Sequence, residues 1–192
     1  MVYNLRFAVC SLFCMVCCCG GLSAQTLKKA TEAEAKAMVA EISKTAAAIR
    51  TLTCSFTQVR TNRLLNDKMT SQGYMSYDAK GKLRWEYTSP YASTFILDGQ
   101  QGEMRGFAQV MMDSMTGKNL TSNKDFACTF FTQGGEWVAE LVPQRKEMKQ
   151  FFSTIRLHFD SKRHMVSQVE MNEKGGDVTI ITLKQVNRET RR

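Results

Sequence analysis

Histidine and catalytic motifs are almost absent from this sequence. Its 192 residues contain two histidines, His158 and His164, which do not stand at a metal-ligand spacing, and no Cys-x-x-Cys pair occurs after residue 24. The chain has no Gly-x-Ser-x-Gly elbow, phosphate-binding loop or dinucleotide fingerprint. We therefore predict no metal centre, no cofactor and no enzymatic activity, and we expect both histidines at exposed positions on strands.

Long apolar runs are missing from the interior, where no stretch approaches the roughly 20 residues of a membrane span. A shorter apolar run near the N-terminus, residues 7–19, follows the positive charge of Arg6 and precedes the small residues of Leu22-Ser23-Ala24. This order is typical of a secretory signal peptide. We expect residues 1–24 to be removed on export, so that the exported protein begins at Gln25.

Cysteine is scarce outside this leader, which holds five of the seven and leaves Cys54 and Cys128. An exported protein can join such a pair in a disulfide, whereas a free cysteine at an apolar strand position acts as a small hydrophobe; both alternatives stay open. A lipid-anchored protein is a further alternative, because Cys17, Cys18 and Cys19 stand where a lipidated cysteine would lie, although the residues before them match a lipobox poorly.

Acidic residues are fewer than basic ones, with 18 Asp and Glu against 26 Lys and Arg, for a formal net charge of +8. The basic residues are scattered without a dense run, so no nucleic-acid partner is predicted. For an exported protein, an anionic membrane surface or an acidic partner suits this charge better.

One long helix is predicted, over residues 31–51. Thr31 and Glu34 have the spacing of a capping box at its start. Apolar residues recur every three or four positions and form one stripe: Ala35, Met38, Ile42, Ala46 and Ile49. We expect this stripe to lie on a sheet.

The remainder alternates between short β-prone runs and turn signals. In residues 83–87 the apolar side chains alternate with Arg84 and Glu86, which predicts a strand with one apolar face. The predicted strands are 52–64, 73–77, 83–87, 94–98, 126–132, 136–142, 155–159, 165–172 and 178–186. Residues 104–112 are either strand or helix, 113–125 a loop, 143–149 a connection with room for one helical turn, and 187–192 a frayed end. About ten consecutive antiparallel strands must curl, because twist accumulates across a sheet.

Short motifs follow one another in the first half of the chain: Ser55-Phe56-Thr57-Gln58, then Gly73, then Arg84-Trp85-Glu86-Tyr87 with Pro90, then Asp98-Gly99. In order and spacing they resemble the LolA family of periplasmic outer-membrane lipoprotein carriers. The resemblance covers about residues 31–102 by motif and the later strands by pattern.

This resemblance implies an α+β fold in which residues 25–192 form one domain. A curved antiparallel sheet would make an unclosed half-barrel of the LolA/LolB type, with the N-terminal helix covering its concave face. It also implies a periplasmic protein that shields the acyl chains of lipoproteins in an apolar cavity between inner and outer membranes. Each acyl CH₂ kept from water is worth roughly 0.8 kcal/mol.

The partners that the resemblance implies are acylated lipoproteins or another lipid cargo, an inner-membrane lipoprotein-releasing transporter and an outer-membrane acceptor, and we expect a monomer. The alternative is a LolA-like paralogue that binds another lipid or lipopeptide as a receptor, a sensor or a pathway-specific shuttle. The residues expected to line the cavity are Phe56, Trp85, Tyr87, Phe95 and Leu97 on strands and Met38, Ile42 and Ile49 on the helix. The faces on which Phe95 and Leu97 lie are left open by the sequence.

Overall fold

The computed structural model describes residues 26–79, 82–98, 120–121 and 124–190, with the backbone alone at positions 97 and 98. Its strands are β1 (Lys28–Lys29), β2 (Ile49–Asn62), β3 (Asp67–Asp78), β4 (Lys82–Ser89), β5 (Ser93–Asp98), β6 (Phe126–Gln133), β7 (Glu136–Pro143), β8 (Phe152–Asp160), β9 (Met165–Glu173) and β10 (Val178–Thr190). The helices are α1 (Glu32–Ala48) and α3 (Lys146–Lys149).

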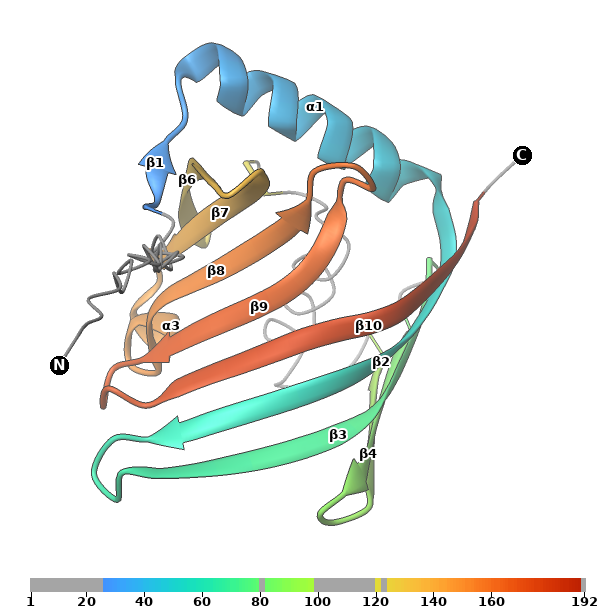
Figure 1. Ribbon diagram of the computed structural model, residues 1–192, viewed down its shortest axis with the longest axis vertical. Coiled ribbons are helices and arrows are strands. Elements are labelled where there is room, and N and C mark those ends of the chain that lie inside the picture. The colour runs from blue at the N-terminus through green and yellow to red at the C-terminus, as the bar shows by residue number, and fades with distance from the viewer. Residues whose placement is uncertain (1–25, 80–81, 99–119, 122–123, 191–192) are drawn as a thin grey trace, which may run out of the picture.

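All ten strands of the described chain belong to one antiparallel sheet with the order β1-β6-β7-β8-β9-β10-β2-β3-β4-β5. It consists of two meanders, β2–β5 and β6–β10, which are joined because β10 pairs with β2. Strands β1 and β5 are the two edges, so the sheet curls without closing (Figure 1). The predicted fold class, a curved antiparallel sheet with one long N-terminal helix, is confirmed.

Helix α1 begins where its capping box predicts. The Glu34 backbone N–H donates to the Thr31 hydroxyl at 3.3 Å, and the Thr31 backbone N–H donates to the Glu34 carboxylate at 2.7 Å. The bond from the Thr31 backbone N–H lowers the pKa of Glu34 most, and a second bond from the Thr31 hydroxyl to the same carboxylate adds to this effect. The predicted end at residue 51 is wrong, because Ile49 already pairs with Thr190 of β10 and belongs to β2.

The later elements follow the predicted alternation, and α3 is the helical turn expected within residues 143–149. The frayed end is wrong for residues 187–190, since β10 continues to Thr190 after a register shift between Lys184 and Asn187 and stays paired with β2. Strand β1, which pairs with β6, was not foreseen from the sequence. The predictions for 104–112 and for most of 113–125 lie outside the described residues.

Both histidines lie elsewhere than expected. His158 is 8% exposed on β8. Because β8 is a central strand, the side chains of Val138 on β7 and Gln168 on β9 stand beside His158 and shield it from water. His164 lies in the turn before β9 with φ 53°, and its ring stacks on Trp137 with centroids 4.9 Å apart. The His164 Nδ1 atom is 3.5 Å from the Glu41 carboxylate of α1, so this turn and the helix are neighbours.

Cys54 and Cys128 are free thiols, which settles the disulfide alternative for this structure. They lie on β2 and β6, strands that are five positions apart in the sheet order. Burial raises the pKa of each thiol to about 12. Both cysteines therefore act as small hydrophobes. In the part of the chain that is described, no helix has the length and apolarity to cross a bilayer.

Candidate functional site

The inner face of the sheet, defined as the face against which α1 packs, carries the candidate site. The helix buries Met38 and Ile42 in the same cluster as Phe56 of β2 and Trp85 of β4, and these four side chains are 0–6% exposed. Alternation along each strand places every second residue on this face. The predicted stripe of α1 thus lies on the face that the sequence motifs occupy.

Four aromatic side chains cross this face from β2 to β5, and we call Phe56, Trp85, Tyr87 and Phe95 the aromatic row. The Phe56 and Trp85 rings stack with centroids 4.1 Å apart and an interplanar angle of 27°. Tyr87 packs edge-on against Phe56 at 5.3 Å and against Phe95 at 6.1 Å. Offset and edge-on arrangements are those that aromatic pairs prefer.

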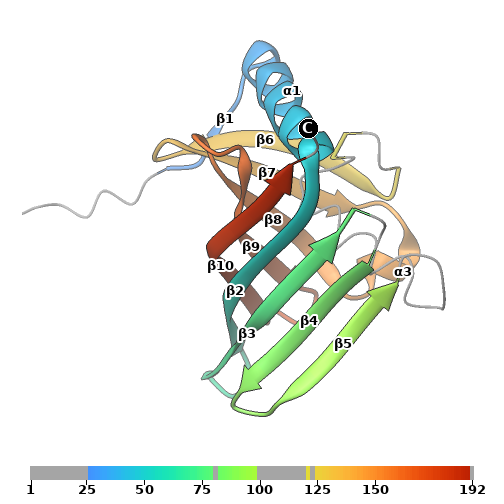
Figure 2. The same ribbon diagram turned by 90° about the vertical axis from the view of Figure 1, so that its right-hand side faces the viewer.

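Exposure rises along the aromatic row. Phe56 is 2% exposed and Trp85 6%, Tyr87 is half-buried, and Phe95 is 54% exposed. Strand β5, which carries Phe95, is an edge of the sheet (Figure 2). The inner face therefore continues as apolar surface from the core to the open edge.

Gly73 makes room for the stacked pair. It lies opposite Phe56 on β3, and a Cβ there would be 2.6 Å from Phe56 Cζ and would collide with the carbonyl oxygen of Glu86. The Phe56 ring thus covers the glycine, as aromatic residues often do for a glycine on the neighbouring strand of a sheet. The glycine was recognised in the sequence as the start of a strand, but its contact with Phe56 was not.

One hydrogen bond orients the Tyr87 ring within the row. The Tyr87 hydroxyl donates to the side-chain oxygen of Gln58 at 2.9 Å, and Gln58 lies two residues beyond Phe56 on the same face of β2. Sequence reasoning missed Gln58 as a site residue, although it belongs to the Ser55–Gln58 motif. It also missed Met75 and Leu83, which are buried on this face beside Trp85.

The structure brings together seven of the eight residues predicted to line a cavity. Met38 and Ile42 of α1 and Ile49 of β2 are 0–3% exposed, so they belong to the buried core between the helix and the sheet. Phe95 pairs with Trp85 and shares its face, which answers the question that the sequence left open. The backbone of Leu97 pairs with Leu83, while its side chain lies outside the described part.

The chemistry of the inner face is apolar contact. Its thiol, Cys54, stays protonated near neutral pH because burial raises its pKa to about 12, and a thiol without its thiolate is a poor nucleophile. No cluster of three or more metal-ligating side chains occurs within the described ranges. The exposed part of the inner face, at Phe95, offers apolar surface, and Gln58 and Tyr87 supply the polar groups beside it.

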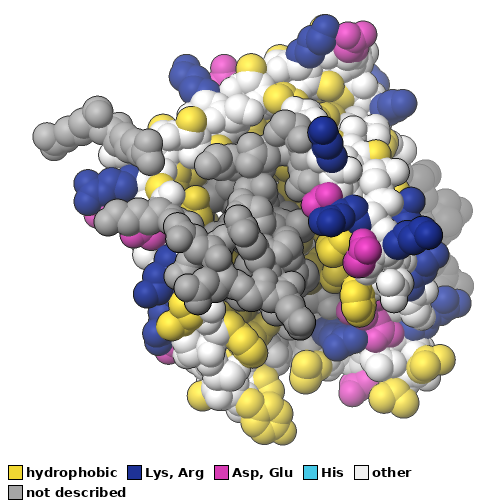
Figure 3. Space-filling view, turned by 180° about the vertical axis from the view of Figure 1, so that it is seen from behind, with side chains coloured by type: hydrophobic (Ala, Val, Ile, Leu, Met, Phe, Trp, Pro, Cys, Tyr) yellow, Lys and Arg dark blue, Asp and Glu magenta, His cyan; other side chains and the backbone are white. Residues whose placement is uncertain are grey.

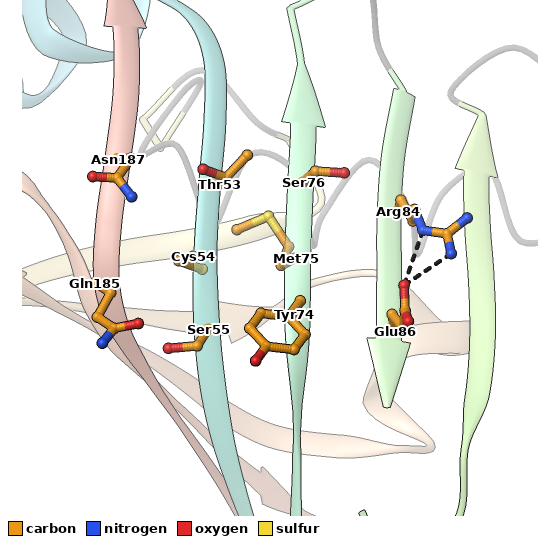
Figure 4. A pocket seen from close by; sticks show the side chains of 10 residues that line it. All are labelled: Thr53, Cys54, Ser55, Tyr74, Met75, Ser76, Arg84, Glu86, Gln185 and Asn187. Carbon is orange, nitrogen blue, oxygen red and sulfur yellow. Dashed lines mark hydrogen bonds and ion pairs between the residues drawn. The ribbon is translucent and has the colours of Figure 1, made fainter. Parts of the chain in front are cut away.

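The outer face carries a separate groove of about 290 Å³ across β10, β2, β3 and β4. Its side chains are mostly polar, and Arg84 donates to the Glu86 carboxylate at 2.8 Å (Figure 4). The groove lies beside the register shift of β10, where Gln185 has φ 51°. Its polarity and its face separate it from the aromatic row, and no pattern in the sequence predicts it.

Comparisons with known proteins agree with the motifs. The model of the family described as "Outer membrane lipoprotein carrier protein LolA" matches residues 47–191. An outer-membrane lipoprotein carrier protein of Chromobacterium violaceum is 27% identical over 171 residues, which cover 81% of this chain and 79% of the relative.

Two solved structures are also similar to this chain. MucB in its complex with MucA from Pseudomonas aeruginosa has a TM-score of 0.44 and 11% identity, and the match covers 82% of this chain but only 58% of that one. A LolA superfamily protein from Nitrosomonas europaea has a TM-score of 0.34 and 8% identity, covering 80% of this chain and 94% of that one.

Proposed function

Because this chain belongs to the outer-membrane lipoprotein carrier family LolA, we propose that it shields the acyl chains of lipoproteins on their way from the inner to the outer membrane. Proteins of this family are carriers, and we propose no catalytic step. The proposal places the exported protein in the periplasm as a monomer. It would receive cargo from an inner-membrane releasing transporter and pass it to an outer-membrane acceptor.

The observation that carries the proposal is the aromatic row. It joins a buried floor, with Phe56 at 2% exposure, to an exposed ring at the sheet edge, with Phe95 at 54%. An acyl chain laid along this row would remove apolar surface of both partners from water, at roughly 0.8 kcal/mol for each CH₂ buried. The row extends over four neighbouring strands, with side chains from β2, β4 and β5. Such a surface would contact the acyl chain and not the polypeptide attached to it, which suits cargo of varied protein sequence.

Two neighbouring residues of β5 provide a matched test. Phe95 and Ile96 are both 54% exposed, but Phe95 pairs with Trp85 on the inner face and Ile96 pairs with Arg84 on the outer face. Phe95→Glu would set a carboxylate against the acyl chains, at a cost of several kcal/mol without a partner. Ile96→Glu adds the same charge one residue away, on the opposite face.

The assay is the binding of a fluorescent fatty acid and its displacement by a triacylated lipopeptide. We expect Phe95→Glu to weaken probe binding by at least about tenfold and Ile96→Glu to leave it unchanged. Equal effects of the two changes, or a folded wild-type protein that binds neither probe nor lipopeptide, would contradict the proposal. Ile42→Glu is unsuitable, because Ile42 is 0% exposed and its replacement would report on folding.

Tryptophan emission can report binding at the row itself. The chain has two tryptophans, and Trp137 lies away from the row, stacked on His164. In a Trp137→Phe background the emission comes from Trp85 alone, so a change on adding lipopeptide reports contact with the inner face. Native mass spectrometry of protein purified from its own host would then identify the cargo, whether a lipoprotein or another lipid.

A further inference from the structure

Two leucines project from the turn that joins β2 to β3. We call residues 63–66 the hairpin tip; within it Leu64 is 91% exposed and Leu65 74%. Leu64 is the most exposed large apolar side chain of the described residues. Exposed apolar residues of this size that occur together mark an interaction site more often than single ones do.

The hairpin tip is held in place by its own hydrogen bonds. The Leu65 N–H donates to Asn62 Oδ1 at 3.0 Å, and the Arg63 N–H donates to Asp177 Oδ1 at 3.0 Å. Asp177 belongs to the neighbouring turn between β9 and β10, where the Arg63 side chain also lies against Gly176. The two turns therefore form one structure that presents the leucines to solvent.

Charge around the hairpin tip is mainly positive on its exposed side. Arg63, Lys68 and Lys174 are exposed, against the one exposed carboxylate of Asp67. The carboxylates of Glu173 and Asp177 face Arg60 instead, at 3.2 and 3.3 Å. Leucines flanked by basic side chains complement a surface that is apolar beneath and negatively charged above, as an anionic bilayer is.

The shape of the hairpin tip favours a bilayer over a folded protein as its partner. A protein would need a hollow matched to two protruding leucines, whereas lipid chains rearrange around them. Tyr91, 80% exposed in the connection from β4 to β5, is an aromatic residue of the kind enriched at membrane interfaces. Figure 2 shows this connection and the β2–β3 turn at the same lower end of the sheet, and hydrophobic side chains gather along the lower rim in Figure 3.

We propose that the hairpin tip docks the protein on a membrane with anionic headgroups by inserting Leu64 and Leu65 between the lipids. Docking at this end would bring the edge strand β5, with Phe95, toward the membrane surface. The proposal goes beyond the carrier function, because it assigns a second surface and holds for any cargo.

The test is sedimentation of the exported protein with lipid vesicles, after mass spectrometry has verified its N-terminus. One set of vesicles contains phosphatidylglycerol with phosphatidylethanolamine, and the other phosphatidylcholine alone. The variant Leu64→Ser/Leu65→Ser removes both apolar side chains. Tyr74→Ser is its control, because Tyr74 is 60% exposed on the outer face, in the groove and away from the hairpin tip.

We expect wild-type protein and Tyr74→Ser to bind the anionic vesicles, and the double leucine variant to bind at least about tenfold more weakly. Lys68→Gln/Lys174→Gln should lower binding to the anionic vesicles alone, and added salt should do the same because it screens the charges. We expect these substitutions to leave the binding of the fatty-acid probe unchanged, so the docking and cargo proposals are tested separately.

Three outcomes would overturn the proposal. The first is wild-type protein that binds neither set of vesicles, and the second is equal binding of wild type and the double leucine variant. The third is a wild-type dimer that the double leucine variant converts to a monomer without a change in vesicle binding, which would assign the hairpin tip to a contact between copies. Circular dichroism should match for all variants, since the replaced side chains are exposed.

Discussion

Replacing Gly73 by alanine puts one methyl group between two strands that have no room for it. The new Cβ would lie 2.6 and 2.8 Å from two carbons of the Phe56 ring and would collide with the backbone oxygen of Glu86. The carbonyl oxygen is part of β4, so it cannot move without a shift of that strand. The ring can swing away only by leaving its stack on Trp85.

Both responses lower the free energy of unfolding. Overpacking costs about 1–3 kcal/mol, and loss of the aromatic stack costs about 0.5–1.5 kcal/mol more. We expect Gly73→Ala to lose about 1.5–4.5 kcal/mol in total. The matched control is Gly175→Ala in the β9–β10 turn, where a Cβ meets nothing within 4 Å and the expected change is within about 0.5 kcal/mol.

The assay is urea unfolding followed by tryptophan emission. Gly73→Ala should shift the midpoint to lower urea with an unchanged slope. A double-mutant cycle with Phe56→Leu separates the two clashes: the penalty should shrink without the ring but persist because of the Glu86 oxygen. If Gly73→Ala lowered the free energy of unfolding by less than about 0.5 kcal/mol, Phe56 and the Glu86 oxygen would not pack on Gly73 as tightly as described.

Two further predictions follow from shifted pKa values. Cys54 and Cys128 should resist thiol reagents near pH 8 in the folded protein, because burial raises each pKa to about 12, and both should react after denaturation; no thiol after denaturation would mean that they are bridged. The backbone hydrogen bond from Arg163 above all, against a smaller effect of burial, holds the pKa of Asp160 below its ordinary value of 3.8. A lowered pKa in the folded state stabilises the fold above pH 3.8, and this contribution is lost as the pH falls through the folded pKa. Asp160→Asn should therefore be less stable than wild type at neutral pH and approach it in acid, as measured by urea unfolding across pH; a difference independent of pH would argue against this.

Features set by neighbouring residues could be predicted from the sequence. The capping box at Thr31 marks the start of α1, and the alternation in 83–87 places Trp85 and Tyr87 on the inner face, as the structure does. Such signals depend on the period of the local backbone. The end of α1 was missed because the apolar spacing at Ile49 fits both a helix and a strand. Its pairing with Thr190, more than a hundred residues later in the sequence, makes it part of β2.

The burial of His158 had no local signal either. Its flanking residues alternate as they would on a strand with one wet face, and only the positions of β7 and β9 on both sides of β8 cover it. Pairing between strands close in sequence is easy to anticipate, whereas the pairing of β10 with β2 requires partners more than a hundred residues apart, such as Leu183 and Phe56. That one pairing decides which strands become edges.

The candidate site depends on this same long-range choice. Because β10 takes the free side of β2, the meander β2–β5 can grow only away from it, and β5 is left as an edge that pairs with β4 alone among the described strands. Phe95 is half-exposed for that reason, although it lies on the same inner face as Phe56 in the core. The sequence thus identifies the apolar side chains of the row, but the sheet order determines which of them face a core and which remain exposed at an edge.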